Sequence, residues 1–135
     1  MKAIPKLTRY MTKIPFAINS EATLDEAMNV MKDKDIRHLP VLKNGKVFGL
    51  VSDRDLQSVS AFAGANPRQI RVGDICNDEM YITKPDTPVD QVASEMASRR
   101  IGSAMVMDNG KLVGIFTTTD ACQALSDICQ VRFHA

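Results

Sequence analysis

The sequence predicts a mixed α/β fold in which two β-α-β-β-α repeats pack sheet to sheet about a pseudo-twofold axis. The first observation is an internal repeat, because residues 22–56 can be laid over residues 87–121 without a gap. In this register the run Asn-Gly-Lys at 44–46 falls on an identical run at 109–111, and a glycine and an aspartate match after it. The second observation is size: a unit of roughly 50–60 residues buries its own sheet poorly, so two copies are expected to share one core.

Each element of the first repeat has a local signal. Residues 16–18 form an extended segment, and residues 24–35 carry apolar side chains at helical spacing with acidic residues in the first turn. A proline ends this helix, so a short strand is expected at 39–42. An Asn-Gly pair, a strong hairpin signal, leads into a second strand at 47–52. A closing helix then begins near Asp53.

The second repeat copies this order. Its extended segment lies at 81–83, its first helix at 89–100, its two strands at 103–107 and 112–117, and its closing helix begins at about Thr118. The resulting division is a first repeat at residues 7–62, a linker at 63–74 and a second repeat at 75–130.

Composition excludes several classes of function. The chain has 135 residues, with 17 basic and 16 acidic side chains and a net charge of +1. Such a balance lacks the broad positive field that non-specific nucleic-acid binding or a polybasic membrane surface requires, and it leaves room only for a local basic pocket. The sequence has no apolar run of membrane-spanning length and no signal-peptide core, which predicts a cytoplasmic protein.

The residues of catalysis and metal binding are sparse. Three cysteines, Cys76, Cys122 and Cys129, are expected to be reduced, buried thiols, and the spacing of the last two indicates core packing rather than a metal site. The two histidines, His38 and His134, form no evident Ser-His-Asp or Cys-His arrangement, and neither repeat contains a P-loop. The sequence therefore predicts no enzyme activity and no required cofactor.

The repeated signatures GLVSDRD and GIFTTTD carry the candidate chemistry. Each places a hydroxyl, Ser52 or Thr117, at the end of a strand, followed by the N-terminus of a helix, which favours a phosphate. Asp55 and Asp120 lie in the first turns of these helices, where a carboxylate can accept hydrogen bonds from both hydroxyls of a ribose. On the pattern alone, an equally good explanation is that all four residues only cap helices.

Together, the Asn-Gly hairpin, the Gly-apolar-apolar-Ser/Thr-x-x-Asp signature, the segment IRHLPV and the preceding phrases LTRYMT and VGDIC resemble the CBS domain family. The resemblance covers the chain from about Leu7 to Cys129, as a tandem pair called a Bateman module that stands alone. It implies a regulatory module that binds AMP, ADP or ATP, with S-adenosylmethionine and NAD as other candidates. Each nucleotide would be shared, with its base against one repeat and its ribose and phosphates on the other.

The resemblance also implies roles for further residues. Arg54, Thr119 and Arg37 would lie near phosphates, and His38 would be a second phosphate donor. The segment Ile101-Gly102-Ser103 would face the adenine ring. The full set expected to bind nucleotide is Arg37, His38, Ser52, Arg54, Asp55, Thr83, Ile101, Gly102, Ser103, Thr117, Thr119 and Asp120. Each of these residues also has an explanation without a ligand. Arg37 could be a solvated surface arginine, His38 a structural histidine, and the segment 101–103 only the start of a strand.

Two further expectations concern partners and asymmetry. A homodimer is predicted through the amphipathic stretches at 25–31 and 91–97, with an unidentified regulated protein as a further partner. A module that dimerises or docks a protein without any ligand is the alternative function. The arginines of the first repeat predict tighter binding of phosphorylated ligands at Asp55 than at Asp120. Arg99 and Arg100 are expected to point to solvent.

Overall fold

The computed structural model describes residues 3–13, 16–62 and 64–133, which form two compact units. One consists of the described residues of Pro15–Met80, here called the first-repeat unit. The other, the second-repeat unit, consists of the described residues of Met1–Ile14 and Tyr81–Ala135. The mixed α/β class and the duplicated β-α-β-β-α order predicted from the sequence are confirmed.

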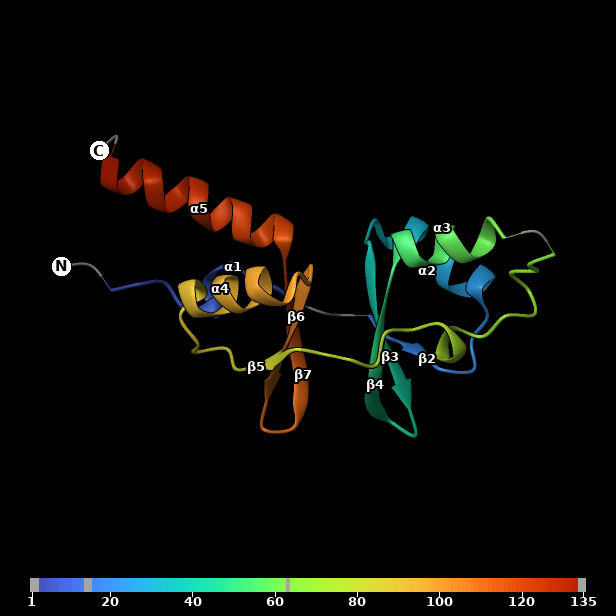
Figure 1. The fold of residues 1–135 in the computed structure, drawn as a ribbon. Coiled ribbons are helices and arrows are strands. Elements are labelled where there is room, and N and C mark those ends of the chain that lie inside the picture. The colour runs from blue at the N-terminus through green and yellow to red at the C-terminus, as the bar shows by residue number, and fades with distance from the viewer. Residues whose placement is uncertain (1–2, 14–15, 63, 134–135) are drawn as a thin grey trace. The chain divides into compact units, whose positions relative to one another are not determined.

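The first-repeat unit is a three-stranded sheet in the order β2-β3-β4, with its two α-helices on one face (Figure 1). Strand β2 is parallel to β3, and β3 is antiparallel to β4. Its elements are β2 (Ile18–Asn19), α2 (Leu24–Lys34), β3 (His38–Lys43), β4 (Lys46–Ser52), α3 (Asp53–Ser60) and the 3₁₀ turn η1 (Val72–Asp74).

The second-repeat unit is a four-stranded sheet in the order β1-β7-β6-β5, again with its helices on one face (Figure 1). Strand β5 is parallel to β6, while β1 and β6 are antiparallel to β7. Its elements are α1 (Leu7–Tyr10), β1 (Thr12–Lys13), β5 (Ile82–Thr83), α4 (Val89–Arg99), β6 (Ser103–Asp108), β7 (Lys111–Thr117) and α5 (Thr118–Phe133).

Local sequence signals explain these elements. Both Asn-Gly pairs turn with positive φ at both residues, as at Asn44 (54°) and Gly45 (77°), which is the geometry of a type I′ hairpin. Helices α2 and α4 both end in a left-handed residue, Asp35 and Arg100, at equivalent places in the repeat. The apolar positions of α2 and α4 enter the cores of their own units, as the helical spacing predicts.

The segment that precedes each repeat packs in the unit of the other repeat. Residues 7–13 were assigned to the first repeat from the sequence, yet Leu7 is buried in the second core and β1 pairs with β7. In the same way Val72 is buried in the first core, and Asn77 pairs with Leu50 of β4. The compact units therefore differ from the sequence repeats predicted at 7–62 and 75–130. The difference arises because the segment before each repeat packs against the sheet of the other repeat.

Close backbone approach accounts for one glycine in each signature. A β-carbon on Gly49 would lie 2.8 Å from the carbonyl oxygen of Asn77 and 2.8 Å from Sγ of Cys76. A β-carbon on Gly114 would lie 2.8 Å from Sδ of Met11 and 3.0 Å from a backbone oxygen. Each glycine thus leaves room for the segment before the other repeat to lie directly against the strand.

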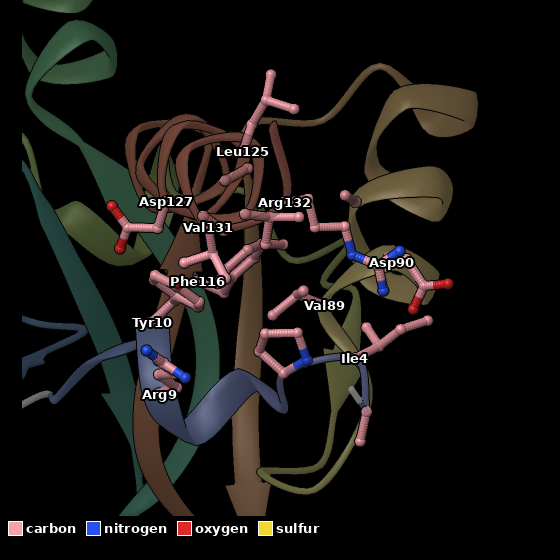
Figure 2. Close-up of a pocket in the computed structure, with 16 residues that line it drawn as sticks. Ile4, Arg9, Tyr10, Val89, Asp90, Phe116, Leu125, Asp127, Val131 and Arg132 are labelled. Carbon is pink, nitrogen blue, oxygen red and sulfur yellow. The ribbon is translucent and has the colours of Figure 1, made fainter. Parts of the chain in front are cut away.

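The two closing helices differ in length, and the longer one borders a groove. Helix α5 has 16 residues and α3 has 8, and α5 buries only Ala124 within its own unit. Beside it lies a pocket of about 600 Å³ within the second-repeat unit, bordered by α5, α4 and the segment 3–10 (Figure 2). The lining residues are Ala3, Ile4, Pro5, Arg9, Tyr10, Val89, Asp90, Ala93, Phe116, Ala121, Ala124, Leu125, Asp127, Ile128, Val131 and Arg132.

The expectation that the cysteines are buried is wrong. The cysteines are not buried: Cys122 is exposed, and Cys76 and Cys129 are half-buried. Helix α5 turns Ala121, Ala124 and Ile128 to the core, so the cysteine face lies away from it. In the stretches 25–31 and 91–97, the buried apolar side chains belong to the cores of their own units, which leaves less apolar surface for a partner. Dimerisation through these stretches stays a prediction.

Candidate functional site

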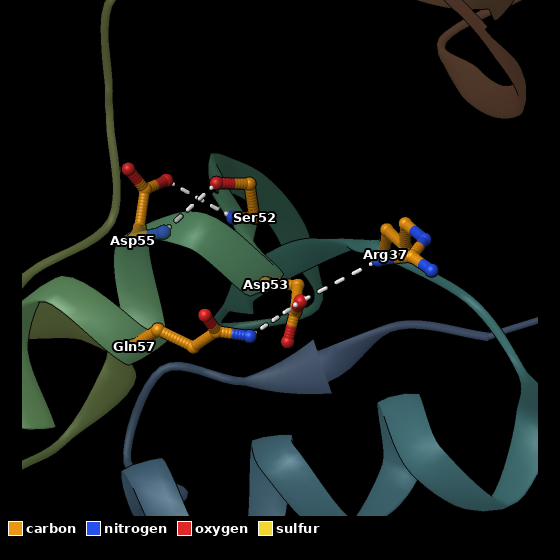
Figure 3. A network of polar contacts seen from close by, with 5 residues as sticks. All are labelled: Arg37, Ser52, Asp53, Asp55 and Gln57. Atoms are coloured by element: carbon orange, nitrogen blue, oxygen red, sulfur yellow. Dashed lines mark hydrogen bonds and ion pairs between the residues drawn. The ribbon is translucent and has the colours of Figure 1, made fainter. Parts of the chain in front are cut away.

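In the first repeat, the signature forms a reciprocal cap where β4 meets α3. The Ser52 hydroxyl accepts a hydrogen bond from the Asp55 backbone N–H at 3.1 Å, and Oδ2 of Asp55 accepts one from the Ser52 N–H at 3.0 Å (Figure 3). Asp55 is exposed, and within the described part of the chain its Oδ1 accepts no hydrogen bond. The capping interpretation is therefore correct here, and it leaves one carboxylate oxygen facing solvent.

In the second repeat, the same cap forms where β7 meets α5. Oδ2 of Asp120 accepts hydrogen bonds from the N–H and the hydroxyl of Thr117, at 2.9 and 3.1 Å. The Asp120 N–H in turn donates to the Thr117 hydroxyl at 3.3 Å. A further donor comes from β1, because the Thr12 hydroxyl lies 3.2 Å from Oδ1 and 3.3 Å from Oδ2 of Asp120.

Arg37 lies beside the first signature and has an acidic neighbour. The Asp53 N–H donates to the Arg37 carbonyl at 2.8 Å, and the Arg37 guanidinium lies 3.8 Å from the Asp53 carboxylate (Figure 3). The Gln57 amide also donates to that carboxylate at 2.9 Å. The Arg37 side chain is 80% exposed, so this ion pair is solvent-screened and leaves the guanidinium able to move.

Small side chains stand at the equivalent place in the second repeat. Gly102 occupies the position of Arg37, and its carbonyl accepts hydrogen bonds from the N–H and hydroxyl of Thr118 at 3.0 and 3.2 Å. Ser103 is the register partner of Thr117, just as His38 is the partner of Ser52 in the first repeat. The structure thus brings Gly102 and Ser103 to the second signature.

The remaining predicted residues divide into those near a signature and those away from it. Arg54 and Thr119 are exposed in the first turns of α3 and α5, beside Asp55 and Asp120 respectively. Ile101 is half-buried against the second core, so its side chain serves packing.

Thr83 lies apart from the second signature. It is 7% exposed and donates a hydrogen bond to the Thr87 hydroxyl at 3.1 Å. Its register partner on β6 is Val106, whereas Ser103 at the start of that strand lies beside Thr117. The structure therefore does not bring Thr83 to the signature, because its strand pairs farther along β6.

The two sites, named here after Asp55 and Asp120, differ in charge. The Asp55 site has two arginines, Arg37 and Arg54, and two carboxylates, whereas the Asp120 site has hydroxyls around a single carboxylate. Arg99 does not change this balance, because it donates to Glu95 on its own helix at 2.7 Å. The Asp55 site is thus the less negative of the two, although Asp53 offsets part of its positive charge.

The described residues contain no group of three or more His, Cys, Asp or Glu side chains placed to hold a metal ion. His134 lies outside the described residues. Burial, followed by the charge of Asp78, raises the pKa of Cys76, so this thiol stays protonated at neutral pH. Over the part of the chain that the structure describes, no helix has the length and apolar character to cross a membrane.

Three relevant features were missed from the sequence. The acidic neighbour of Arg37, Asp53, could have been recognised from the sequence, because it lies inside the signature beside Arg54. Thr12 lies in the phrase LTRYMT, but its contact with Asp120 joins residues far apart in the chain. The groove beside α5 has no sequence signal, because three separate segments line it.

Comparisons with known proteins agree with the duplicated architecture. The family model of the CBS domain matches twice, at residues 7–61 and 72–127. A CBS domain-containing protein of Dictyostelium discoideum is 30% identical over 141 residues, covering 96% of this chain and 96% of the relative.

Two solved structures share the fold over nearly their whole length. One, described as an acetoin utilization protein (AcuB) from Vibrio cholerae, has a TM-score of 0.80 at 25% identity and covers 98% of both chains. The other is the CBS domain pair of protein MJ0100 in complex with 5′-methylthioadenosine and S-adenosyl-L-methionine. It has a TM-score of 0.81 at 24% identity, covering 93% of this chain and 99% of the other. With two matches of the family model and these structural likenesses, the chain belongs to the CBS domain family and carries two CBS domains in tandem.

Proposed function

We propose that this CBS domain pair is a regulatory module that binds an adenosine-containing ligand at the Asp55 and Asp120 sites. The observation that carries the proposal is the repeated junction of strand and helix, where a capped carboxylate stands at the protein surface beside a hydroxyl. CBS domain pairs are in general regulatory ligand-binding modules, and the pair of MJ0100 is named as a complex with two adenosine compounds.

The chemistry of the Asp55 site suits a ribose with phosphate attached. The exposed Oδ1 of Asp55 can accept a hydrogen bond from a ribose hydroxyl, and such a bond to a charged acceptor is stronger than a neutral one. The N-terminus of α3 favours negative charge, and Arg54 lies in its first turn. A phosphate would also compete with Asp53 for Arg37, because the ion pair between Arg37 and Asp53 is long and exposed.

The Asp120 site suits a less charged adenosine compound. It offers hydroxyl groups and the small residues Gly102 and Ser103, but its signature carries no arginine. A phosphate there would meet the Asp120 carboxylate without a cation to offset the repulsion. Phosphorylated ligands are therefore expected to prefer the Asp55 site.

The first test is calorimetric titration with AMP, ADP, ATP, S-adenosylmethionine and NAD. For the phosphorylated ligand that binds best, Asp55→Asn should weaken the tighter event at least about tenfold, because the amide keeps the cap but loses the charge. Asp120→Asn is the matched control and should leave this event unchanged. The charge argument is wrong if Asp120→Asn removes the tight event and Asp55→Asn does not.

The groove beside α5 supports self-association of the second-repeat unit. Exposed apolar side chains stand on α5 and at the N-terminal edge, with Leu125 at 64% and Phe133 at 77% exposure. The groove's charged residues are two acids and two bases: Asp90, Asp127, Arg9 and Arg132. A twofold interface needs a self-complementary surface, and this balance of charges meets that need for a second copy of the chain.

The second test concerns this dimer. Leu125→Glu would place a charge on the apolar face, so the variant is expected to shift from dimer to monomer in light scattering at micromolar concentration. Phe62→Glu is the control, because Phe62 is 69% exposed but belongs to the first-repeat unit. A monomeric wild-type protein would contradict the proposal. A dimer that binds none of the five ligands would favour the ligand-independent interaction module instead.

A further inference from the structure

Thr12 is the point where the N-terminal segment meets the Asp120 site. Its hydroxyl lies within hydrogen-bond distance of both carboxylate oxygens of Asp120, at 3.2 and 3.3 Å. The equivalent residue of the other repeat, Asn77, pairs with Leu50 as Thr12 pairs with Ile115. Its side-chain oxygen, however, accepts from the Glu79 N–H at 3.0 Å instead of contacting a signature aspartate.

The two oxygens of the Asp120 carboxylate accept different sets of hydrogen bonds. Oδ2 already accepts two hydrogen bonds from Thr117, which hold the carboxylate in its orientation. Among the described residues, Thr12 is the one donor to Oδ1. A ribose that uses both carboxylate oxygens would therefore need the place taken by the Thr12 hydroxyl, whose shared contacts are long and weak.

We propose that Thr12 competes with the ligand for the Asp120 carboxylate and thereby makes the N-terminal segment sensitive to occupancy of that site. This inference rests on the proposed function, because it requires Asp120 to accept a hydrogen bond from a ligand. Thr12 does not orient the carboxylate, since Thr117 already does so. Its removal should accordingly improve ligand binding rather than impair it.

The same short segment reaches the groove beside α5. Strand β1 pairs with β7 over only two residues, and the preceding residues Ile4, Arg9 and Tyr10 line the groove. Burial, followed by the nearby carboxylate of Asp127 on α5, raises the pKa of Tyr10. Loss of the Thr12 contact would loosen a segment that borders the proposed dimer face. If ligand binding weakens the docking of this segment by a given factor, then by linkage an interaction that holds the segment in place weakens ligand binding by that same factor.

The test compares Thr12→Val with Thr8→Val, both in an Asp55→Asn background that isolates the Asp120 site. Thr12→Val removes the competing hydroxyl at nearly constant shape, so calorimetry with S-adenosylmethionine, adenosine and AMP should show binding about three- to tenfold tighter. Thr8 is the matched control on the same segment, because its hydroxyl donates to the Pro85 carbonyl at 2.8 Å and not to Asp120. Thr8→Val should leave the affinity unchanged.

Amide hydrogen exchange gives a second readout in the wild-type chain. Saturating ligand should speed exchange in a peptide covering residues 3–13, because Thr12 is displaced. Slower exchange there, or equal or weaker binding by Thr12→Val, would overturn the inference while leaving the proposed function intact. Absence of binding by every variant and by the wild-type chain at both sites would overturn the two together. Binding that appears only in Thr12→Val would support competition most directly.

Discussion

Phe116→Ala is expected to destabilise the second-repeat unit by about 3–5 kcal/mol, the usual cost of emptying a large aromatic site in a core. The Phe116 side chain is fully buried and packs in the second core while also lining the groove beside α5. Since small domains are stable by only about 5–15 kcal/mol, this loss is a large share of the total. Urea unfolding followed by circular dichroism would measure it.

Phe116→Val is the matched control, because the first repeat has Val51 at the equivalent, equally buried position. It leaves a smaller cavity than alanine and should therefore cost less. A cost below about 1 kcal/mol for Phe116→Ala would mean that the side chain is not enclosed as the structure describes.

Gly49→Ala is expected to destabilise the protein by about 1–3 kcal/mol, because the added methyl group would overlap its surroundings. The 2.8 Å approach to the Asn77 carbonyl can be relieved only by moving backbone. Gly114→Ala should cost less, since its closest neighbour is the flexible end of Met11, but it should also displace Thr12 from Asp120. Thermal unfolding and ligand titration of both variants would separate these effects.

Gly102→Ala provides the control for this series. A β-carbon there would have the Thr118 hydroxyl as its nearest neighbour, at an ordinary contact distance of 3.5 Å. We expect a change of less than about 0.5 kcal/mol. Equal costs for Gly102 and Gly49 would indicate a general effect of replacing glycine rather than the close approach of residues 76–77.

Short-range features were predictable because their causes are local. The helical spacing of Leu24, Ala27 and Met31 placed α2, and the Asn-Gly pairs placed both hairpins with the expected positive φ. The spacing of three residues between Ser52 and Asp55 is the spacing of a reciprocal cap, so that cap was correctly recognised as one of two explanations. The internal repeat could be recognised without a structure, because it is a property of the amino-acid sequence alone.

The sequence by itself determined the fold class, the duplication, the order of elements and the placement of both signatures where a strand meets a helix. Only the tertiary structure decided which unit each preceding segment joins, which side of α5 is buried and which donor reaches Asp120. The reason is physical. Periodicity and turn chemistry act over a few residues, whereas the contact of Thr12 with Asp120 joins residues that come together only when the chain folds.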